Sequence, residues 1–166
     1  MRSADRLLLV VAMAIFAFFV DQESKTLIER TIMQPPRVIE LSSYLNIVLV
    51  YNTGISFGIF GGSMADRQLY LIVLNLLIVA GLLVWSTQTP SAVERAGLGL
   101  VCGGAIGNIF DRWKKGGVTD FIDFHWGVLH WPAFNLADVT ISIGFAFVLY
   151  ASFRTPRASF KEGRLS

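Results

Sequence analysis

The chain alternates between long apolar segments and the polar stretches that separate them. The apolar segments cover about residues 7–28, 69–85, 92–110 and 139–153. A helix that crosses a membrane needs about 20 mostly apolar residues. Leu7–Val20 alone is too short, but the helix reaches this length if it continues through Ile28. A signal peptide would have a small-residue cleavage site after its apolar core, but here the polar stretch Asp21–Lys25 stands in that place. We therefore interpret the first segment as a transmembrane helix.

The stretch at 31–66 carries a different pattern. Pro35 and Pro36 end any helix there. Runs rich in Val, Ile, Tyr and Phe follow, separated by turn-forming residues; they are Val38–Leu41, Tyr44–Tyr51 and Ile55–Phe60. These runs predict a small antiparallel sheet that rests on the helices or on the membrane surface. The other long polar stretch, 112–137, is predicted as a loop, and loops of this length are often functional.

Composition supports an integral membrane protein of one domain. Of the 166 residues, 54% are hydrophobic and 16% are charged, and the mean hydropathy is +0.57. Soluble domains have about a quarter charged residues. The expected fold class is a membrane all-α bundle of four transmembrane helices with a small extracytoplasmic antiparallel β-sheet. A net charge of +2 from scattered basic residues argues against nucleic-acid binding. The single cysteine, Cys102, lies in an apolar segment and is predicted to be a core residue.

Lysine and arginine positions predict the orientation in the membrane. Arg2 and Arg6 precede the first segment, and the tail at 154–166 is basic. Because cytoplasmic segments are enriched in Lys and Arg, both termini are predicted to be cytoplasmic. The opposite side carries as many basic residues, but several of them have acidic neighbours. The sheet and the 112–137 loop are then predicted to face outward.

Two spacings on the helices predict contacts. Gly99, Gly103 and Gly107 recur every four residues and fall on one face, which predicts the close approach of another helix. On the first segment, Asp21 and Lys25 lie one turn apart and are predicted to form an ion pair. That pair can stabilise the helix end or support a functional site.

Aspartates are concentrated between the last two apolar segments, at Asp111, Asp120, Asp123 and Asp138. A carboxylate beside an apolar segment is costly to desolvate, so it is usually paired, solvated or functional. Two carboxylates held close together can share one proton, and such a pair can activate water and protonate a leaving amine without a metal or other cofactor. We expect two of these aspartates to form a catalytic pair at a membrane surface.

The residues alone leave other roles open for these aspartates. Asn135 can cap the fourth helix, with Asp138 completing a capping box three residues later. Asp111 can instead be the partner of an arginine, either Arg112 or Arg67.

Further patterns in the chain are weak. Gly54–Gly58 matches the G-x-S-x-G motif around Ser56, but that motif requires a strand-to-helix turn in a large α/β sheet. His125 and His130 have nearby aspartates, but their spacing fits no common metal motif, and we predict no metal site. Asp123, close to His125, can be a solvated loop residue.

Five motifs resemble those of the lipoprotein signal peptidase (signal peptidase II) family, in the family's order. They are D-Q-x-x-K at Asp21–Lys25, N-T-G at Asn52–Gly54, G-G-A-I-G-N-I-F-D-R at Gly103–Arg112, V-T-D-F-I-D-F at Val118–Phe124 and F-N-L-A-D at Phe134–Asp138. The resemblance implies a bacterial inner-membrane aspartic endopeptidase with four transmembrane helices, cytoplasmic termini and a periplasmic active site. It implies removal of signal peptides from prolipoproteins, by cleavage before a diacylglyceryl-modified cysteine. The expected partners are these substrates and membrane lipids, and we expect a monomer without a cofactor.

The resemblance also implies roles for individual residues. It makes Asp120 and Asp138 the catalytic pair. It assigns substrate binding or support to Asp21, Lys25, Asn52, Gly54, Asn108, Asp111, Arg112 and Asn135. Asp111 lies in the longest motif and is interpreted as a support that orients Arg112 or the backbone.

The chain departs from the family pattern at Ile55–Gly58, where small residues are common, and at Thr119, where Val is commoner. Both departures bear on the shape of a substrate groove more than on the reaction. Two other functions stay open on the sequence alone. One is a small non-enzymatic membrane transporter that uses the aspartates as an ion path. The other is a serine protease that uses Ser56.

Overall fold

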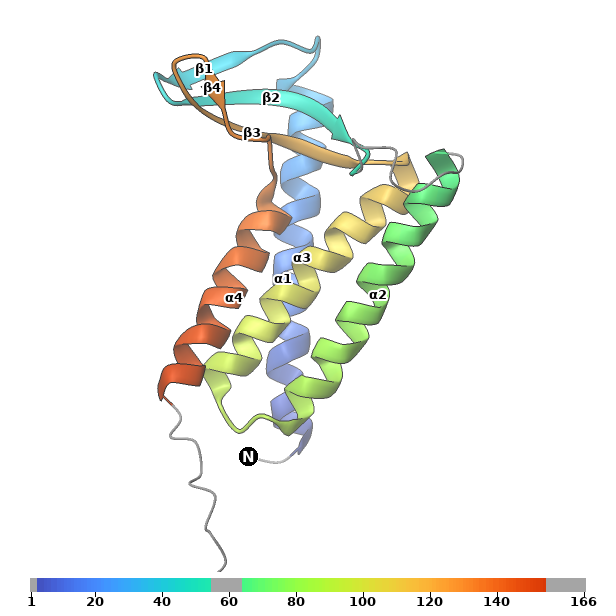
Figure 1. Cartoon of the computed structure of the whole chain (residues 1–166), viewed down its shortest axis with the longest axis vertical. Helices are drawn as coiled ribbons and strands as arrows, with labels where there is room; N and C mark the ends of the chain where they lie inside the picture. Colours follow the sequence, from blue (N-terminus) through green and yellow to red (C-terminus); the bar gives the residue numbers. More distant parts are fainter. Residues whose placement is uncertain (1–2, 55–63, 155–166) are drawn as a thin grey trace, which may run out of the picture.

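The structure, a computed structural model, describes residues 3–54 and 64–154 and consists of long helices capped at one end by a sheet (Figure 1). The helices are α1 (Ser3–Leu27), α2 (Met64–Gln88), α3 (Ala92–Lys115) and α4 (Leu136–Arg154). A π-helical turn, η1 (Ile28–Ile32), extends α1. The start of α1 and the end of α4 both lie at the end of the bundle opposite the sheet. All four predicted apolar segments are therefore helical.

The described helices differ in how well they suit a membrane. Three segments are long and apolar enough to cross one: Arg6–Ile32, Ala65–Gln88 and Leu136–Arg154. The helix α3 is rich in glycine, carries charged residues near both ends and packs against each of the other three helices. Because polar residues of membrane helices face the bundle interior, a central helix does not need an apolar surface. Since α3 is not among the three apolar segments, the presence of four transmembrane helices stays a prediction.

One glycine face of α3 lies against α1. A Cβ at Gly99 would be 2.6 Å from the carbonyl oxygen of Val10, and a Cβ at Gly103 would be 2.3 Å from that of Ala14. Real Cβ atoms do not approach a backbone this closely, so only glycine allows the two helices to meet. The predicted close approach of another helix is confirmed.

A second glycine face of α3 lies against α4. A Cβ at Gly97 would be 2.5 Å from the carbonyl oxygen of Gly144, and a Cβ at Gly104 would be 2.6 Å from that of Ala137. Since Ala137 directly precedes Asp138, this contact holds the start of α4 against the middle of α3. The position of the first turn of α4 is therefore determined by backbone contact.

The sheet is antiparallel and has the strand order β1-β2-β3-β4. Its strands are β1 (Ile39–Ser42), β2 (Leu45–Asn52), β3 (Val118–Trp126) and β4 (Leu129–His130). The first two agree with predicted strands to within one residue at each end. The third predicted strand, Ile55–Phe60, lies outside the described residues.

The stretch at 112–137 differs from the predicted loop. The helix α3 continues to Lys115, and β3 and β4 follow it. Polar residues at 120 and 123 break the period-two alternation that marks a half-buried strand, so the local pattern does not indicate β3. The strand forms because β2 supplies a partner far away in the sequence, with Asn46 opposite Asp123. Half of the sheet therefore comes from the region that carries the aspartates.

Apolar contacts join the sheet to the end of α1. Ile28, Met33 and Phe121 are buried together, and residues of β1 and β2 pack around them. The sheet therefore rests on the helices, one of the two predicted supports. Within the bundle, Cys102 is 1% exposed and packs with Val79, which confirms its prediction as a core residue.

Candidate active site

Polar side chains from the sheet and the helices meet where the sheet joins the bundle. Asp120 lies on β3, and Asn52 is the last residue of β2. Asn108 lies on α3, Asp138 lies in the first turn of α4, and Asn135 precedes that helix. The fold thus brings together residues that are spread over most of the chain.

Asp120 is buried and surrounded by amide donors. Its Oδ2 accepts a hydrogen bond from Asn52 Nδ2 at 2.8 Å, and its Oδ1 accepts one from Asn135 Nδ2 at 2.6 Å. Burial raises the pKa of Asp120, and the two amides lower it by a smaller amount. The negative charge of Asp138 raises the pKa of Asp120 further. The net effect is a raised pKa, which favours the protonated form of Asp120 more than in an ordinary aspartate.

Asp138 takes part in a helix cap as well as in this cluster. Its Oδ2 accepts from the backbone N–H of Asn135 at 3.2 Å, and its own N–H donates to Asn135 Oδ1 at 3.1 Å. This is the reciprocal capping box that the sequence left open as an alternative. The other oxygen, Oδ1, accepts from Asn108 Nδ2 at 3.1 Å. Capping and membership of the cluster therefore coexist in one residue.

Asn135 joins the two carboxylates. Its side-chain Nδ2 donates to Asp120, and its Oδ1 and backbone N–H bind Asp138. The same Nδ2 lies 3.3 Å from Asn108 Oδ1, and that oxygen also accepts from Lys25. Because Asn108 Oδ1 faces donors, its amide nitrogen is directed to Asp138. Two carboxylates with different neighbours can divide the roles of acid and base, which is the chemistry of an aspartate pair.

Lys25 lies at the centre of a buried charge cluster behind the aspartates. Its Nζ is 2.7 Å from Asp21 Oδ2, 3.0 Å from Asp111 Oδ2 and 3.1 Å from Asn108 Oδ1. Lys25 is 1% exposed, and Asp21 and Asp111 are 0% exposed. The predicted Asp21–Lys25 ion pair is confirmed. Since it is fully buried and shared with Asp111, it does more than stabilise an exposed helix end.

Asp111 contacts lysines and the backbone. Its Oδ1 is 3.1 Å from Lys115, and its Oδ2 accepts the backbone N–H of Thr119 at 3.2 Å. Asp111 thus hydrogen-bonds the backbone, as expected of a support, and its ion pairs among the described residues are with Lys25 and Lys115 and not with Arg67 or Arg112. Arg112 donates from Nη1 to the carbonyl oxygen of Asn108 at 3.3 Å.

Gly54 shapes the turn that orients Asn52. It has a φ of +80°, which favours glycine, and its N–H donates to Asn52 Oδ1 at 2.8 Å. That bond leaves the Asn52 Nδ2 free to bind Asp120. A Cβ at Gly54 would be 2.9 Å from Leu71 Cδ1 and 3.7 Å from Arg112 Nη2. These contacts explain why Asn52 and Gly54 occur together in the N-T-G motif. Ser56 lies outside the described residues.

Glu29, Lys115 and Thr119 form a polar cluster that was not predicted from the sequence. Lys115 Nζ donates to Thr119 Oγ1 at 3.0 Å, and Glu29 Oε1 accepts from both Lys115 and Thr119. The position of Lys115, four residues after Asp111 on one helix, is a signal that could have suggested their contact. No local pattern links Glu29 to Thr119, which are 90 residues apart.

Asp123 belongs to a different environment at the far end of β3. It is 7% exposed, which excludes the solvated-loop interpretation. Its Oδ1 is 2.9 Å from His130 Nδ1, and its Oδ2 accepts from Asn46 Nδ2 at 3.0 Å. The hydrogen bond from His130 lowers the pKa of Asp123. The histidine rings of His125 and His130 stack at 5.0 Å.

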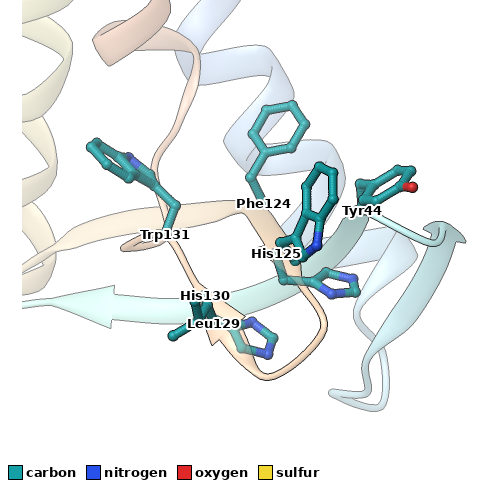
Figure 2. Close-up of a pocket in the computed structure, with 7 residues that line it drawn as sticks. Tyr44, Phe124, His125, Leu129, His130 and Trp131 are labelled. Carbon is teal, nitrogen blue, oxygen red and sulfur yellow. The ribbon is translucent and has the colours of Figure 1, made fainter.

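A pocket opens around the hairpin of β3 and β4 (Figure 2). It is lined mainly by aromatic side chains and by the two histidines: Tyr44, Phe124, His125, Trp126, Leu129, His130 and Trp131. None of the residues predicted for the catalytic site lines it. Within residues 3–54 and 64–154, no group of three or more His, Cys, Asp or Glu side chains is arranged to hold a metal ion.

Comparisons with known proteins give one consistent result. Residues 13–154 match the family described as Signal peptidase (SPase) II. A lipoprotein signal peptidase of Aeromonas hydrophila is 36% identical over 147 residues, which cover 87% of this chain and 88% of that protein. One from Nitratidesulfovibrio vulgaris is 35% identical, covering 89% and 91%. A solved bacterial membrane enzyme, determined by the in meso method at 1.9 Å resolution, has a TM-score of 0.75 and 27% identity, covering 87% of this chain and 92% of its own.

Proposed function

The chain belongs to the signal peptidase II family, and from this premise we propose that it is an aspartic endopeptidase that removes signal peptides from prolipoproteins. It cleaves before a diacylglyceryl-modified cysteine, with Asp120 and Asp138 as the catalytic pair. The observation that carries the proposal is the double role of Asn135, whose side chain binds Asp120 while its side-chain oxygen and backbone bind Asp138. Two carboxylates from separate elements are thereby held in one polar cluster.

The different surroundings of the carboxylates suggest how they divide the reaction. Asp138 lies at a helix N-terminus, which favours a negative charge, and it acts as the base that takes a proton from water. The water oxygen attacks the carbonyl carbon of the scissile peptide bond. Asp120, whose raised pKa favours its protonated form, hydrogen-bonds the carbonyl oxygen as negative charge develops there. Asp138 gives the proton that it took from water to the leaving amine as the C–N bond breaks, so the pair returns to its starting state.

The surrounding polar residues suit an extended peptide. Asn52, Asn108 and Asn135 each direct an amide nitrogen toward a carboxylate of the pair. Arg112 lies on the same face of α3 one turn after Asn108, and the charges of both Asp120 and Asp138 act on it. A peptide backbone that enters a site at a membrane surface needs such donors and acceptors, since water is scarce there.

The sheet lies at the end of the bundle opposite the start of α1 and the end of α4 (Figure 1), and the two aspartates lie where the sheet joins the bundle. We therefore place the sheet and the catalytic pair on the periplasmic side of the inner membrane, with four transmembrane helices and both termini in the cytoplasm. The large exposed apolar side chains of α1, α2 and α4, such as Phe16, Leu77 and Phe153, face membrane lipid in this arrangement. The enzyme acts as a monomer.

The decisive experiment compares purified wild type with Asp120→Asn and Asp138→Asn on a diacylglyceryl-modified prolipoprotein. Asn preserves the shape of each side chain but cannot take up and return a proton, so both variants should lose cleavage while keeping the melting behaviour of a folded protein. The double variant should be hardly worse than either single one, because the residues act as a unit. Unmodified precursor is the substrate control. Normal cleavage by both variants would overturn the proposal, and altered ion flux in that case would favour the transporter.

A further inference from the structure

We propose that Lys115, together with Glu29 and Thr119, positions Asp120 relative to Asp138. The inference rests on the proposed function, because it concerns the same pair of aspartates. None of the three residues touches either carboxylate in the described contacts. Their effect passes through the backbone and through the buried charge cluster around Lys25.

The residue before each catalytic aspartate is tied to a buried carboxylate. Thr119, which precedes Asp120, donates its backbone N–H to Asp111 Oδ2 at 3.2 Å. Ala137, which precedes Asp138, donates its backbone N–H to Asp21 Oδ1 at 2.9 Å. The locations of the two catalytic residues therefore depend on where these two carboxylates lie.

One ammonium group links the two anchoring carboxylates. Lys25 Nζ is 2.7 Å from Asp21 Oδ2 and 3.0 Å from Asp111 Oδ2. The three side chains are almost completely buried, so their charges are poorly screened and the loss of one partner leaves a costly unpaired charge. The start of β3, bound by Asp111, and the start of α4, bound by Asp21, are thus connected through Lys25.

Lys115 fixes Asp111, the aspartate of this bridge that binds β3, from the side opposite Lys25. Asp111 uses both oxygens for cations, with Lys25 at Oδ2 and Lys115 3.1 Å from Oδ1. Lys115 also donates to Thr119 Oγ1 at 3.0 Å. Thr119 is therefore fixed twice, at its N–H by Asp111 and at its hydroxyl by Lys115 and Glu29.

The hydroxyl of Thr119 provides contacts that valine, the commoner residue at this position in the family, could not make. Valine has a similar shape but could neither donate to Glu29 nor accept from Lys115. Glu29 comes from η1, Lys115 from the last turn of α3 and Thr119 from β3, so the cluster ties three elements together. Asp120 is the next residue along β3, and a shift of Thr119 moves it directly.

The test compares Lys115→Met with Lys114→Met in the purified enzyme. Lys114 is the matched control, because it is the neighbouring lysine and its Nζ lies over the Phe110 ring at 5.5 Å. Lys115→Met should lower kcat by about tenfold or more with little change in KM, since small misplacements of catalytic groups are costly. Lys115→Arg should restore most of the loss. Lys114→Met should behave like wild type.

A pH profile separates positioning from a loss of folded protein. If β3 shifts, Asp120 loses contact with the Asn52 and Asn135 amides, which lower its pKa. Since Asp120 acts in its protonated form, the alkaline limb of the kcat profile of Lys115→Met should therefore move to higher pH, whereas partial unfolding would lower the amplitude alone. A kcat and a pH profile equal to those of Lys114→Met would overturn the inference.

A second variant and a titration test the positioning role if Lys115→Met does not fold or if the wild type does not cleave. If Lys115→Met does not fold, Thr119→Val supplies the test, with the same shift in the pH limb and a smaller loss of kcat expected. No change in that variant would overturn the inference. If the wild type itself cleaves no prolipoprotein, the proposed function fails, and the 13C titration of the Asp120 carboxyl still tests the positioning. An identical titration in wild type and Lys115→Met would then count against it.

Discussion

Two aspartate–asparagine pairs connect β2 and β3, and they have opposite properties. Asp120 accepts from Asn52 near the helices, and Asp123 accepts from Asn46 at the other end of the strand. Burial raises the pKa of Asp120, whereas the hydrogen bond from His130 lowers the pKa of Asp123. The same two residue types on the same two strands thus give one carboxyl group suited to hold a proton and one that loses it readily.

A β-bulge makes this difference possible. Residues three apart on a strand point to opposite faces, so Asp120 and Asp123 do not face the same way. The register between β2 and β3 shifts between Ile47 and Val50, where β2 has one residue more than β3. An extra residue changes the face to which the following side chains point. Asn46 and Asn52 can therefore each reach a different aspartate.

The largest expected contrast is between Asp120→Asn and Asp123→Asn in prolipoprotein cleavage. Asp120→Asn removes the acid–base group that the proposed function assigns to this residue, and it should lower kcat by about 10²–10⁴-fold. Asp123→Asn should keep most activity, because its neighbours are His130 and Asn46 at the far end of the strand. The measurement is the initial rate of signal-peptide release by folded protein. Equal losses in the two variants would show that both aspartates serve the reaction.

The asparagines extend the contrast with a smaller effect. Asn52→Ala removes one hydrogen bond to Asp120 and should lower kcat by about tenfold, since a hydrogen bond contributes about 0.5–1.5 kcal/mol. Asn46→Ala removes the equivalent bond to Asp123 and should leave kcat unchanged while lowering stability by a similar free energy. Rates and melting curves of both variants provide the check. A tenfold lower kcat in Asn46→Ala would contradict the separation of the two pairs.

The sequence predicts the features of this molecule that depend on local spacing. The apolar segments, the glycine face of α3 and the Asp21–Lys25 pair all follow from periods of about one helical turn. The strand β3 does not, because its partner lies on β2 and its polar residues interrupt the alternation. The choice between Asp120 and Asp123 is hidden for the same reason: both occur in V-T-D-F-I-D-F, and only non-local asparagines distinguish them. The resemblance to a family suggested Asp120, and the physical pattern alone did not.

The opposite pKa shifts predict opposite effects of pH on stability. The folded-state pKa of Asp120 is raised, so its contribution to stability is present at acidic pH and is lost as the pH rises through that pKa. Asp120→Asn should therefore melt at a higher temperature than wild type at neutral pH and close to it at acidic pH. The folded-state pKa of Asp123 is lowered, so its contribution is present at neutral pH and is lost as the pH falls through that pKa.

Asp123→Asn should accordingly be less stable than wild type at neutral pH, with the difference shrinking toward acidic pH. Melting temperatures of wild type and both variants in detergent, measured across a pH series, give the comparison. Parallel curves for the two variants would mean that the aspartates share one environment.

The smallest effect is expected for His130→Phe, which keeps a flat ring against His125 and removes the Nδ1 partner of Asp123. The pKa of Asp123 should then rise toward its ordinary range, because the hydrogen bond from His130 is the main cause of its lowering. At neutral pH the variant should lose about 0.5–1.5 kcal/mol of stability, the size of one hydrogen bond. Cleavage and the titration of Asp120 should not change, since neither His130 nor Asp123 contacts the polar cluster around Asp120 and Asp138. A 13C titration of both carboxyls reports the two ends of β3 in one experiment. If the Asp120 titration moved together with that of Asp123, the strand would transmit changes along its length. The hairpin pocket and the cluster around Asp120 would then be energetically coupled.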